Sequence, residues 1–416
     1  MVASELQAFA SQFVASTRDY VFVRPEDRLL ILRPNKIHHL NRTATEMLSR
    51  LYAQDTPDAA AVVRDTASRY NMPGDTVEAD LKRLLESLAL VLQDREGAAP
   101  AVRRTPFGSH IRSLPVLSEI ALTYRCQNHC TFCYASAPDR GQKVSEMTTA
   151  QVVHILDTIV DDARVPTVSF TGGEPTLRPD LPELIAYAKS RRLRTNLITN
   201  GIRCASTRYV EDLAAAGLDS AQVSLEAADP DVHDSIVGHR GAWRSTVQGV
   251  QHLRAAGIHV HTNTTINSQN RNCLLDLVDF LARMEQPYLS MNMVIRTGGA
   301  VGSVEIGYEE IGKLVVALRD RAQEHGMRFV WYSPVGFCVF NPVAHGLGSQ
   351  SCSAADGLLS VAPDGSVLPC SSFEQGVGNL LHESFDVIWN RRSTKYGRHK
   401  EFLPPGCRDC DLADLC

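Results

Sequence analysis

The 416-residue sequence has no apolar run that approaches the roughly 20 residues of a membrane-spanning helix. The first residues, Met1 to Gln7, are acidic and amphipathic, and they lack the basic and then apolar pattern of a secretory signal peptide. An excess of positive charge is also absent, because the formal net charge is −5, which argues against a general nucleic-acid-binding surface. We therefore expect a cytoplasmic protein that has neither a membrane nor a nucleic acid among its partners.

Cysteine, by contrast, is abundant. Eleven cysteines are many for a cytoplasmic protein, where structural disulfides are rare. Nine of them fall into two groups, one within residues 126–133 and one within residues 338–416. Cys204 and Cys273 stand apart, in or just before predicted helices, and we expect them to be buried thiols. This grouping predicts metal binding.

The first group has the spacing C-x3-C-x2-C, with Cys126, Cys130 and Cys133 on one short loop. Thiolates suit the irons of a 4Fe–4S cluster, and three of them leave the fourth iron open to a small chelating molecule. The β-prone run 116–124 leads into this loop, so the cysteines should lie at the carboxyl end of a strand, where α/β barrels build active sites. The alternative is a zinc knuckle, which needs a fourth ligand such as His129.

The chain is long enough for two or three domains. Residues 18–95 predict a small, winged-helix-like α+β domain of βββααα order, with Asn41 as the cap of its first helix. Residues 96–115 have the Gly, Ala, Pro and Arg content of a linker. Residues 116–330 alternate six strand-like runs with helical ones and predict a partial (β/α)6 barrel of the TIM type. Residues 331–416 contain the second cysteine group.

A second motif, Thr171-Gly172-Gly173-Glu174-Pro175, follows the second barrel strand. Its glycines allow close approach to the backbone, and Glu174 is an acceptor for a cationic amine. Together, the two motifs resemble the signature of the radical S-adenosylmethionine (SAM) superfamily. The resemblance implies that SAM chelates the open iron of the cluster on Cys126, Cys130 and Cys133. It also implies that one electron converts SAM to methionine and a 5′-deoxyadenosyl radical, which abstracts a substrate hydrogen.

The resemblance further implies SAM contacts at the strand ends, for which a simple strand-end cap is the alternative in each case. The expected SAM-binding residues are Tyr134, Gly172, Gly173, Glu174, Asn200, Ser224, Glu226 and Thr264. Relatives that act on peptides often bind the SAM carboxylate with an arginine after the fourth strand. Val237 lies near that place in this chain, and Arg240 is the nearest substitute.

The second cysteine group resembles the SPASM/twitch extension, which carries auxiliary iron–sulfur clusters. Its pattern is C-x12-G-x4-C followed by C-x2-C-x5-C. The resemblance implies one auxiliary cluster on Cys352, Cys370, Cys407 and Cys410. A second, incomplete cluster that uses Cys416 with an aspartate such as Asp414 is an alternative, and a zinc ribbon is another.

The run from Leu40 to Leu48 resembles the strand-to-helix junction of PqqD-like leader-peptide-recognition domains. In that family a precursor peptide adds to the sheet edge as an extra strand. A scaffolding or dimerising winged helix is the alternative.

These resemblances imply a radical SAM oxidoreductase that crosslinks or dehydrogenates a ribosomally synthesised peptide, with electrons from a donor such as flavodoxin or ferredoxin. One rival is a SPASM/twitch enzyme that acts on a small molecule such as a sugar, an alcohol or a tetrapyrrole. Another is a binding protein with an inert cluster.

Overall fold

The computed structural model describes residues 2–33, 36–92, 102–104, 113–302, 304–348 and 352–413. Most of the predicted linker, Cys416 and Asp414 lie outside these residues. The chain forms two compact units, one of residues 1–106 with 112–116 and one of residues 107–111 with 117–416.

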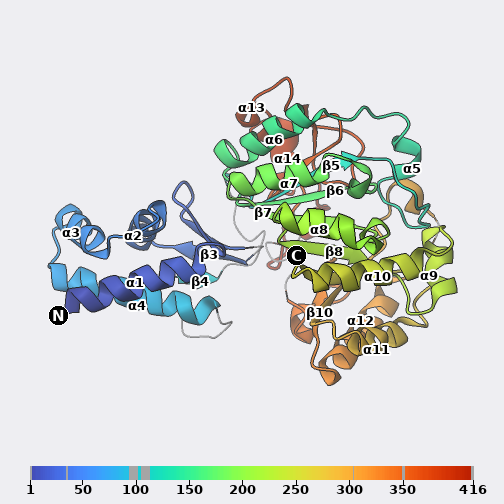
Figure 1. The fold of residues 1–416 in the computed structure, drawn as a ribbon, viewed down its shortest axis with the longest axis horizontal. Helices are drawn as coiled ribbons and strands as arrows, with labels where there is room; N and C mark the ends of the chain where they lie inside the picture. Colours follow the sequence, from blue (N-terminus) through green and yellow to red (C-terminus); the bar gives the residue numbers. More distant parts are fainter. Residues whose placement is uncertain are drawn as a thin grey trace. The chain divides into compact units, whose positions relative to one another are not determined.

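The first unit is a four-stranded antiparallel sheet with four helices, in the strand order β1-β2-β3-β4 (Figure 1). Its elements are α1 (Val2–Thr17), β1 (Val21–Arg24), β2 (Leu29–Leu32), β3 (Lys36–Leu40), α2 (Arg42–Ala53), α3 (Ala59–Tyr70), α4 (Gly74–Leu92) and β4 (Val102–Arg104). The side chain of Asn41 accepts a hydrogen bond from the backbone N–H of Ala44, so it caps α2 as predicted. The structure adds α1 and β4 to the predicted βββααα order. Leu48 and Leu81 are fully buried in its core.

The second unit is built on a ten-stranded sheet of order β11-β10-β9-β8-β7-β6-β5-β12-β13-β14. Seven neighbouring strands from β5 to β11 are parallel, which confirms the predicted α/β class and adds a seventh parallel strand. They are β5 (Leu117–Thr123), β6 (Thr167–Gly172), β7 (Arg194–Thr199), β8 (Ser220–Ser224), β9 (His259–Ile266), β10 (Tyr288–Met293) and β11 (Arg328–Trp331).

Helices alternate with these strands and pack against the outer face of the sheet (Figure 1). The main ones are α6 (Thr149–Asp161), α7 (Leu181–Ser190), α8 (Thr207–Ala215), α10 (Ala242–Ala255), α11 (Leu274–Arg283) and α12 (Tyr308–Glu324). Apolar strand residues such as Leu197 and Val223 are fully buried. The alternating positions are polar and half-buried, for example Ser169, Asn196 and Gln222. The inner face of the sheet is therefore polar, as befits a surface that lines a binding space.

The C-terminal segment continues the same sheet, because β12 (Leu358–Val361) pairs in parallel with β5. An antiparallel hairpin links β12 to β13 (Ser366–Leu368), and β14 (Gly378–Asn379) follows at the edge. The remaining helices of the segment are α13 (Phe385–Trp389), α14 (Arg392–Arg398) and α15 (Pro405–Arg408). In the part of the chain that the structure describes, no helix combines the length and the apolar character that crossing a membrane requires.

Candidate functional site

The loop with Cys126, Cys130 and Cys133 leaves the carboxyl end of β5, as predicted. Its backbone is fixed from two sides. The N–H of His129 donates to the carbonyl of Val237 at 2.8 Å, at the end of α9 (Pro230–Val237). The N–H of Gly299, after β10, donates to the carbonyl of Cys133 at 3.0 Å. Distant parts of the barrel thus hold the cysteine loop in one conformation.

Glycines surround the same loop so closely that any side chain would collide with its backbone. A Cβ atom on Gly172 would lie 2.1 Å from the carbonyl oxygen of Thr123, and one on Gly173 would lie 2.5 Å from that of Arg125. A Cβ on Gly298 would lie 2.3 Å from the carbonyl oxygen of Tyr134. Gly141 and Gly238 make similarly close approaches to the loop. Only glycine fits these positions, so the Gly-Gly motif positions the cysteines as well as leaving backbone open to a ligand.

The three sulfur atoms lie in an environment suited to thiolates bound to metal. Backbone N–H groups donate to two of them, from Asn128 to Cys126 Sγ and from Ala137 to Cys133 Sγ, each at 3.4 Å. Burial raises the pKa of the free Cys126 thiol to about 12 and that of Cys130 well above its ordinary value. Because a metal-bound thiolate is deprotonated, loading this site must release protons.

No three Cys, His, Asp or Glu side chains converge on a point that could hold a single metal ion in the described part of the chain.

The Glu174 carboxylate is fully buried and saturated by hydrogen bonds from the protein. Its Oε1 accepts from the hydroxyls of Thr176 at 2.6 Å and Thr199 at 2.7 Å, and also from the backbone N–H of Thr176. Its Oε2 accepts from the N–H of Asn200 at 2.8 Å. Burial raises the pKa of this carboxyl. The side chain thus ties the ends of β6 and β7 together, a positioning role that the motif alone did not reveal.

The other expected SAM contacts lie at the carboxyl ends of β7, β8 and β9. The Asn200 side-chain amide interacts with the Cys126 thiol. In the cysteine loop, Gln127 Oε1 and Asn128 Oδ1 are buried and have no partner among the described residues. Such unpaired polar atoms are costly unless a ligand meets them, which fits a polar molecule bound beside Cys126.

Glu226 and Thr264 are also partly engaged by the protein. Glu226 Oε2 accepts from the N–H of Thr265 at 2.9 Å, and burial raises the pKa of Glu226 to about 8. The Thr264 hydroxyl donates to the carbonyl of Leu225 at 2.7 Å. Ser224 is half-buried at the end of β8. The roles of these residues toward SAM stay predictions.

Tyr134 extends toward the C-terminal segment. Its hydroxyl lies 3.5 Å from Ser371 Oγ, and Ser371 follows Cys370 directly. The backbone N–H of Ser371 donates to Glu119 on β5 at 3.2 Å. Sequence reasoning missed Glu119 and Ser371. The available signal was Glu119 itself, the only charged residue in an otherwise uncharged strand.

The C-terminal cysteines are only partly brought together in the described residues. Cys370 is half-buried, with its Sγ 2.8 Å from Ser372 Oγ, and the charge of Cys352 affects its pKa, so these two lie near each other. Cys407 and Cys410 are exposed, on α15 and in the turn after it. Their joint ligation of one cluster stays a prediction, and Cys416 lies outside the described residues.

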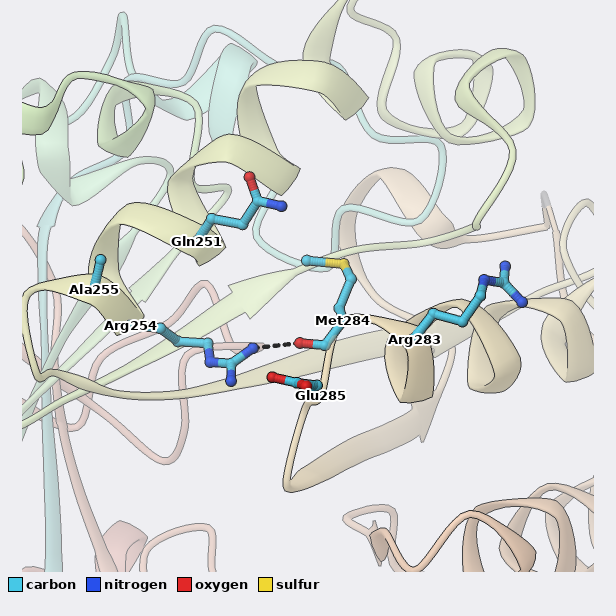
Figure 2. A pocket seen from close by; sticks show the side chains of 6 residues that line it. All are labelled: Gln251, Arg254, Ala255, Arg283, Met284 and Glu285. Atoms are coloured by element: carbon cyan, nitrogen blue, oxygen red, sulfur yellow. Dashed lines mark hydrogen bonds between the residues drawn. The ribbon is translucent and has the colours of Figure 1, made fainter.

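A hollow in the second unit lies away from this site. It is lined by Gln251, Arg254, Ala255, Arg283, Met284 and Glu285, as Figure 2 shows. The Arg254 guanidinium donates across it to the Met284 carbonyl. These residues precede β9 and β10, so the hollow lies at the opposite end of the strands from the cysteine loop.

Comparison with family models matches three segments of the chain. The radical SAM superfamily model matches residues 120–281 and includes all three front cysteines. Residues 120–281 therefore form a radical SAM domain. A SPASM model, described as an iron–sulfur cluster-binding domain, matches residues 352–411. The model of coenzyme PQQ synthesis protein D (PqqD) matches residues 23–90.

Curated relatives match most of this chain, at modest sequence identity. AdoMet-dependent heme synthase of Nitratidesulfovibrio vulgaris is 27% identical over 325 residues, covering 71% of this chain and 84% of the relative. PqqA peptide cyclase of Ruegeria pomeroyi is 28% identical over 316 residues, covering 72% of this chain and 81% of the relative. Among solved structures, Streptococcus suis SuiB bound to precursor peptide SuiA aligns with a TM-score of 0.71 at 16% identity, covering 96% of this chain and 93% of that one. These likenesses confirm the fold.

A radical SAM domain and a SPASM domain imply a SAM-binding 4Fe–4S cluster, SAM itself and auxiliary clusters. When bound, the front cluster and SAM supply an oxidant that removes a hydrogen atom from an unactivated carbon. The chain's part is to fix the thiolates, to present the Gly172–Gly173 backbone and to surround the ligand with polar groups. The half-buried thiols and the unpaired amide oxygens of Gln127 and Asn128 fit that task.

A mutation of Gly173 tests the close packing around the cysteine loop. Gly173→Ala places a methyl group against the Arg125 carbonyl, so we expect the loop to shift and the iron and sulfide content after anaerobic reconstitution to fall severalfold. Gly74→Ala is the matched control, because nothing lies within 4 Å of its added Cβ. Equal iron content in both variants would show that the loop does not depend on this contact.

A buried histidine on the inner face predicts a pH dependence of stability. His261 Nδ1 lies 2.9 Å from the Tyr288 hydroxyl and its Nε2 lies 3.2 Å from Gln222 Oε1, and burial lowers the pKa of His261 from 6.5 to about 4. The unfolded chain therefore binds a proton that the folded chain does not, so stability is lost as the pH falls from 6.5 to 4.

Replacement of this histidine should remove part of this loss of stability at low pH. Relative to wild type, His261→Gln should gain about 3 kcal/mol in the free energy of unfolding between pH 7 and pH 4, measured by urea denaturation. His259→Gln, at an exposed position of the same strand, is the control. If the free energy of unfolding changed equally with pH in wild type and in His261→Gln, the lowered pKa of His261 would be contradicted.

Proposed function

We propose that this protein is a radical SAM peptide maturase that oxidatively crosslinks or dehydrogenates a ribosomally synthesised peptide. The observation that carries the proposal is the fusion of a PqqD-like unit to a radical SAM barrel and a SPASM segment in one chain. PqqA peptide cyclase is a relative whose name states a peptide substrate, and SuiB shares the fold over nearly the full length of both chains.

Within this proposal each group of site residues has a role. Cys126, Cys130 and Cys133 hold the SAM-binding cluster. The contacts to SAM come from Tyr134, Gly172, Gly173, Asn200, Ser224, Glu226 and Thr264, and Glu174 positions the strand ends that carry several of them. Cys352, Cys370, Cys407 and Cys410, with Cys416, hold auxiliary iron–sulfur centres that take up the second electron of a two-electron oxidation. A flavodoxin or ferredoxin supplies the electron that starts the reaction.

The first unit supports recognition of an extended peptide. Its antiparallel sheet ends at β1 on one side and at the three-residue strand β4 on the other. A strand edge presents regularly spaced N–H and C=O groups to which a peptide can pair, independent of its side chains. Binding there would tether a precursor by its leader, while the segment to be modified reaches the barrel.

The similarity to AdoMet-dependent heme synthases favours a second candidate, oxidation of a small molecule such as a tetrapyrrole. Those alignments cover 71% and 73% of this chain. The PqqD match and the full-length likeness to a peptide-bound structure favour the peptide substrate.

Reaction with a candidate precursor tests the proposal. We expect the full-length, reconstituted protein with reductant and SAM to remove two hydrogen atoms from the short peptide encoded beside its gene, detected by mass spectrometry. Cys126→Ala should give no product, because the cluster loses a ligand. A peptide without its leader should react far more slowly.

An unmodified peptide, together with rapid 5′-deoxyadenosine release on addition of a tetrapyrrole, would contradict the peptide assignment and favour the second candidate.

A further inference from the structure

Glu119 lies on the inner face of the barrel, on the strand that leads to the cysteine loop. Ala121, two residues further along β5 and so on the same face, belongs to a small buried cluster against which Cys126, Cys133 and Tyr134 pack. Successive same-face residues of a strand are about 7 Å apart. The Glu119 side chain therefore leaves β5 about 7 Å from Ala121, on the side away from the cysteine loop.

The C-terminal segment fixes this carboxylate in one orientation. Ser360, directly opposite Glu119 in the β12–β5 register, donates its hydroxyl to Glu119 Oε1 at 2.7 Å. The backbone N–H of Ser371 donates to the same oxygen at 3.2 Å. These donors come from different positions of the segment, so they restrict the orientation of the carboxylate.

Glu119 has no cation to balance its charge. The Ser371 hydroxyl is a third hydrogen-bond donor to the carboxylate, and no described Lys, Arg or His pairs with it. The side chains at the same level of the neighbouring strands, Ser169, Asn196 and Ser220, are neutral and bonded to one another. Burial raises the pKa of Glu119, as expected for a carboxyl without a counter-charge.

Other enclosed carboxylates of this unit are either compensated or closed off from a substrate. Glu146 pairs with Arg125 at 2.7 Å, and Asp180 pairs with Arg178 at 2.6 Å. Glu174, which lacks a cation, accepts four hydrogen bonds that occupy both oxygens. Glu226 also lacks a cation and accepts from the Thr265 N–H, but like Glu174 it is fully buried, whereas Glu119 is half-buried on the polar inner face.

Proteins rarely enclose a carboxylate without a counter-charge, because its desolvation is unfavourable and neutral donors restore only part of the lost interactions. We propose that Glu119 is a subsite for a cationic group of the substrate, a primary ammonium or a guanidinium, which binds the carboxylate. The inference rests on the proposed function, since a peptide offers such groups as lysine or arginine side chains. It makes Glu119 a determinant of which peptide segment reaches the reaction site.

A double-mutant cycle tests the subsite with the precursor peptide encoded beside the gene and with variants in which each lysine is replaced by norleucine and each arginine by citrulline. With wild-type enzyme, loss of the recognised cation should lower kcat/KM by roughly 30-fold or more, as for a partly buried charge pair. With Glu119→Gln, the same peptide change should alter kcat/KM by less than about threefold. Peptide affinity, measured by fluorescence anisotropy without reductant, should follow the same pattern.

The controls separate this role from a structural one. Glutamine still accepts hydrogen bonds from Ser360 and Ser371, so Glu119→Gln should retain its iron and its release of 5′-deoxyadenosine from SAM. Glu310→Gln, at an exposed carboxylate paired with Arg271, should behave as wild type.

Equal losses in wild type and Glu119→Gln, a modified peptide segment without any cationic residue, or loss of iron from Glu119→Gln would each overturn the subsite. Wild-type enzyme that leaves the peptide unmodified would instead contradict the proposed function, and the subsite would fall with it.

Discussion

Close contact between glycine backbone and the cysteine loop is the constraint on which the site depends. Gly172 and Gly173 at the end of β6 and Gly298 after β10 leave no room for a side chain against the loop. Hydrogen bonds to Val237 and from Gly299 add contacts from α9 and from the loop after β10. The barrel thus fixes three thiolates from several sides, so that a cluster can be held while one iron stays open to SAM.

The C-terminal segment is part of the same sheet as the barrel strands. Its strand β12 extends the barrel sheet beside β5, and its hairpin brings Cys370 and Ser371 toward Tyr134. The strand β5 therefore connects to both cysteine groups: its carboxyl end leads into the front cysteine loop, and its neighbour β12 belongs to the segment that contains Cys370. This arrangement suits an oxidation in which a hydrogen atom leaves the substrate at one centre and an electron leaves toward another.

Much of this architecture could be predicted from the sequence. The alternating strands and helices, the two barrel motifs and the Asn41 cap are encoded locally, in spacing and in residue type. The strands β11 and β12 were not recognised as barrel strands, because β11 has only four residues and β12 pairs with a strand more than 200 residues earlier. The saturated bonding of Glu174 and the unbalanced charge of Glu119 also depend on such long-range contacts, which no local pattern contains.

The proposed reaction requires an open iron in the cluster at the front loop, and hyperfine spectroscopy tests for this iron most directly. Protein reconstituted anaerobically, with the C-terminal cysteines replaced by alanine so that only the front cluster remains, is reduced and mixed with SAM that carries 15N in its amino group and 17O in its carboxylate. We predict that SAM changes the electron paramagnetic resonance spectrum of the reduced cluster and that both labels show direct coupling to it. A site that holds zinc, or a cluster spectrum that SAM leaves unchanged, would contradict the account.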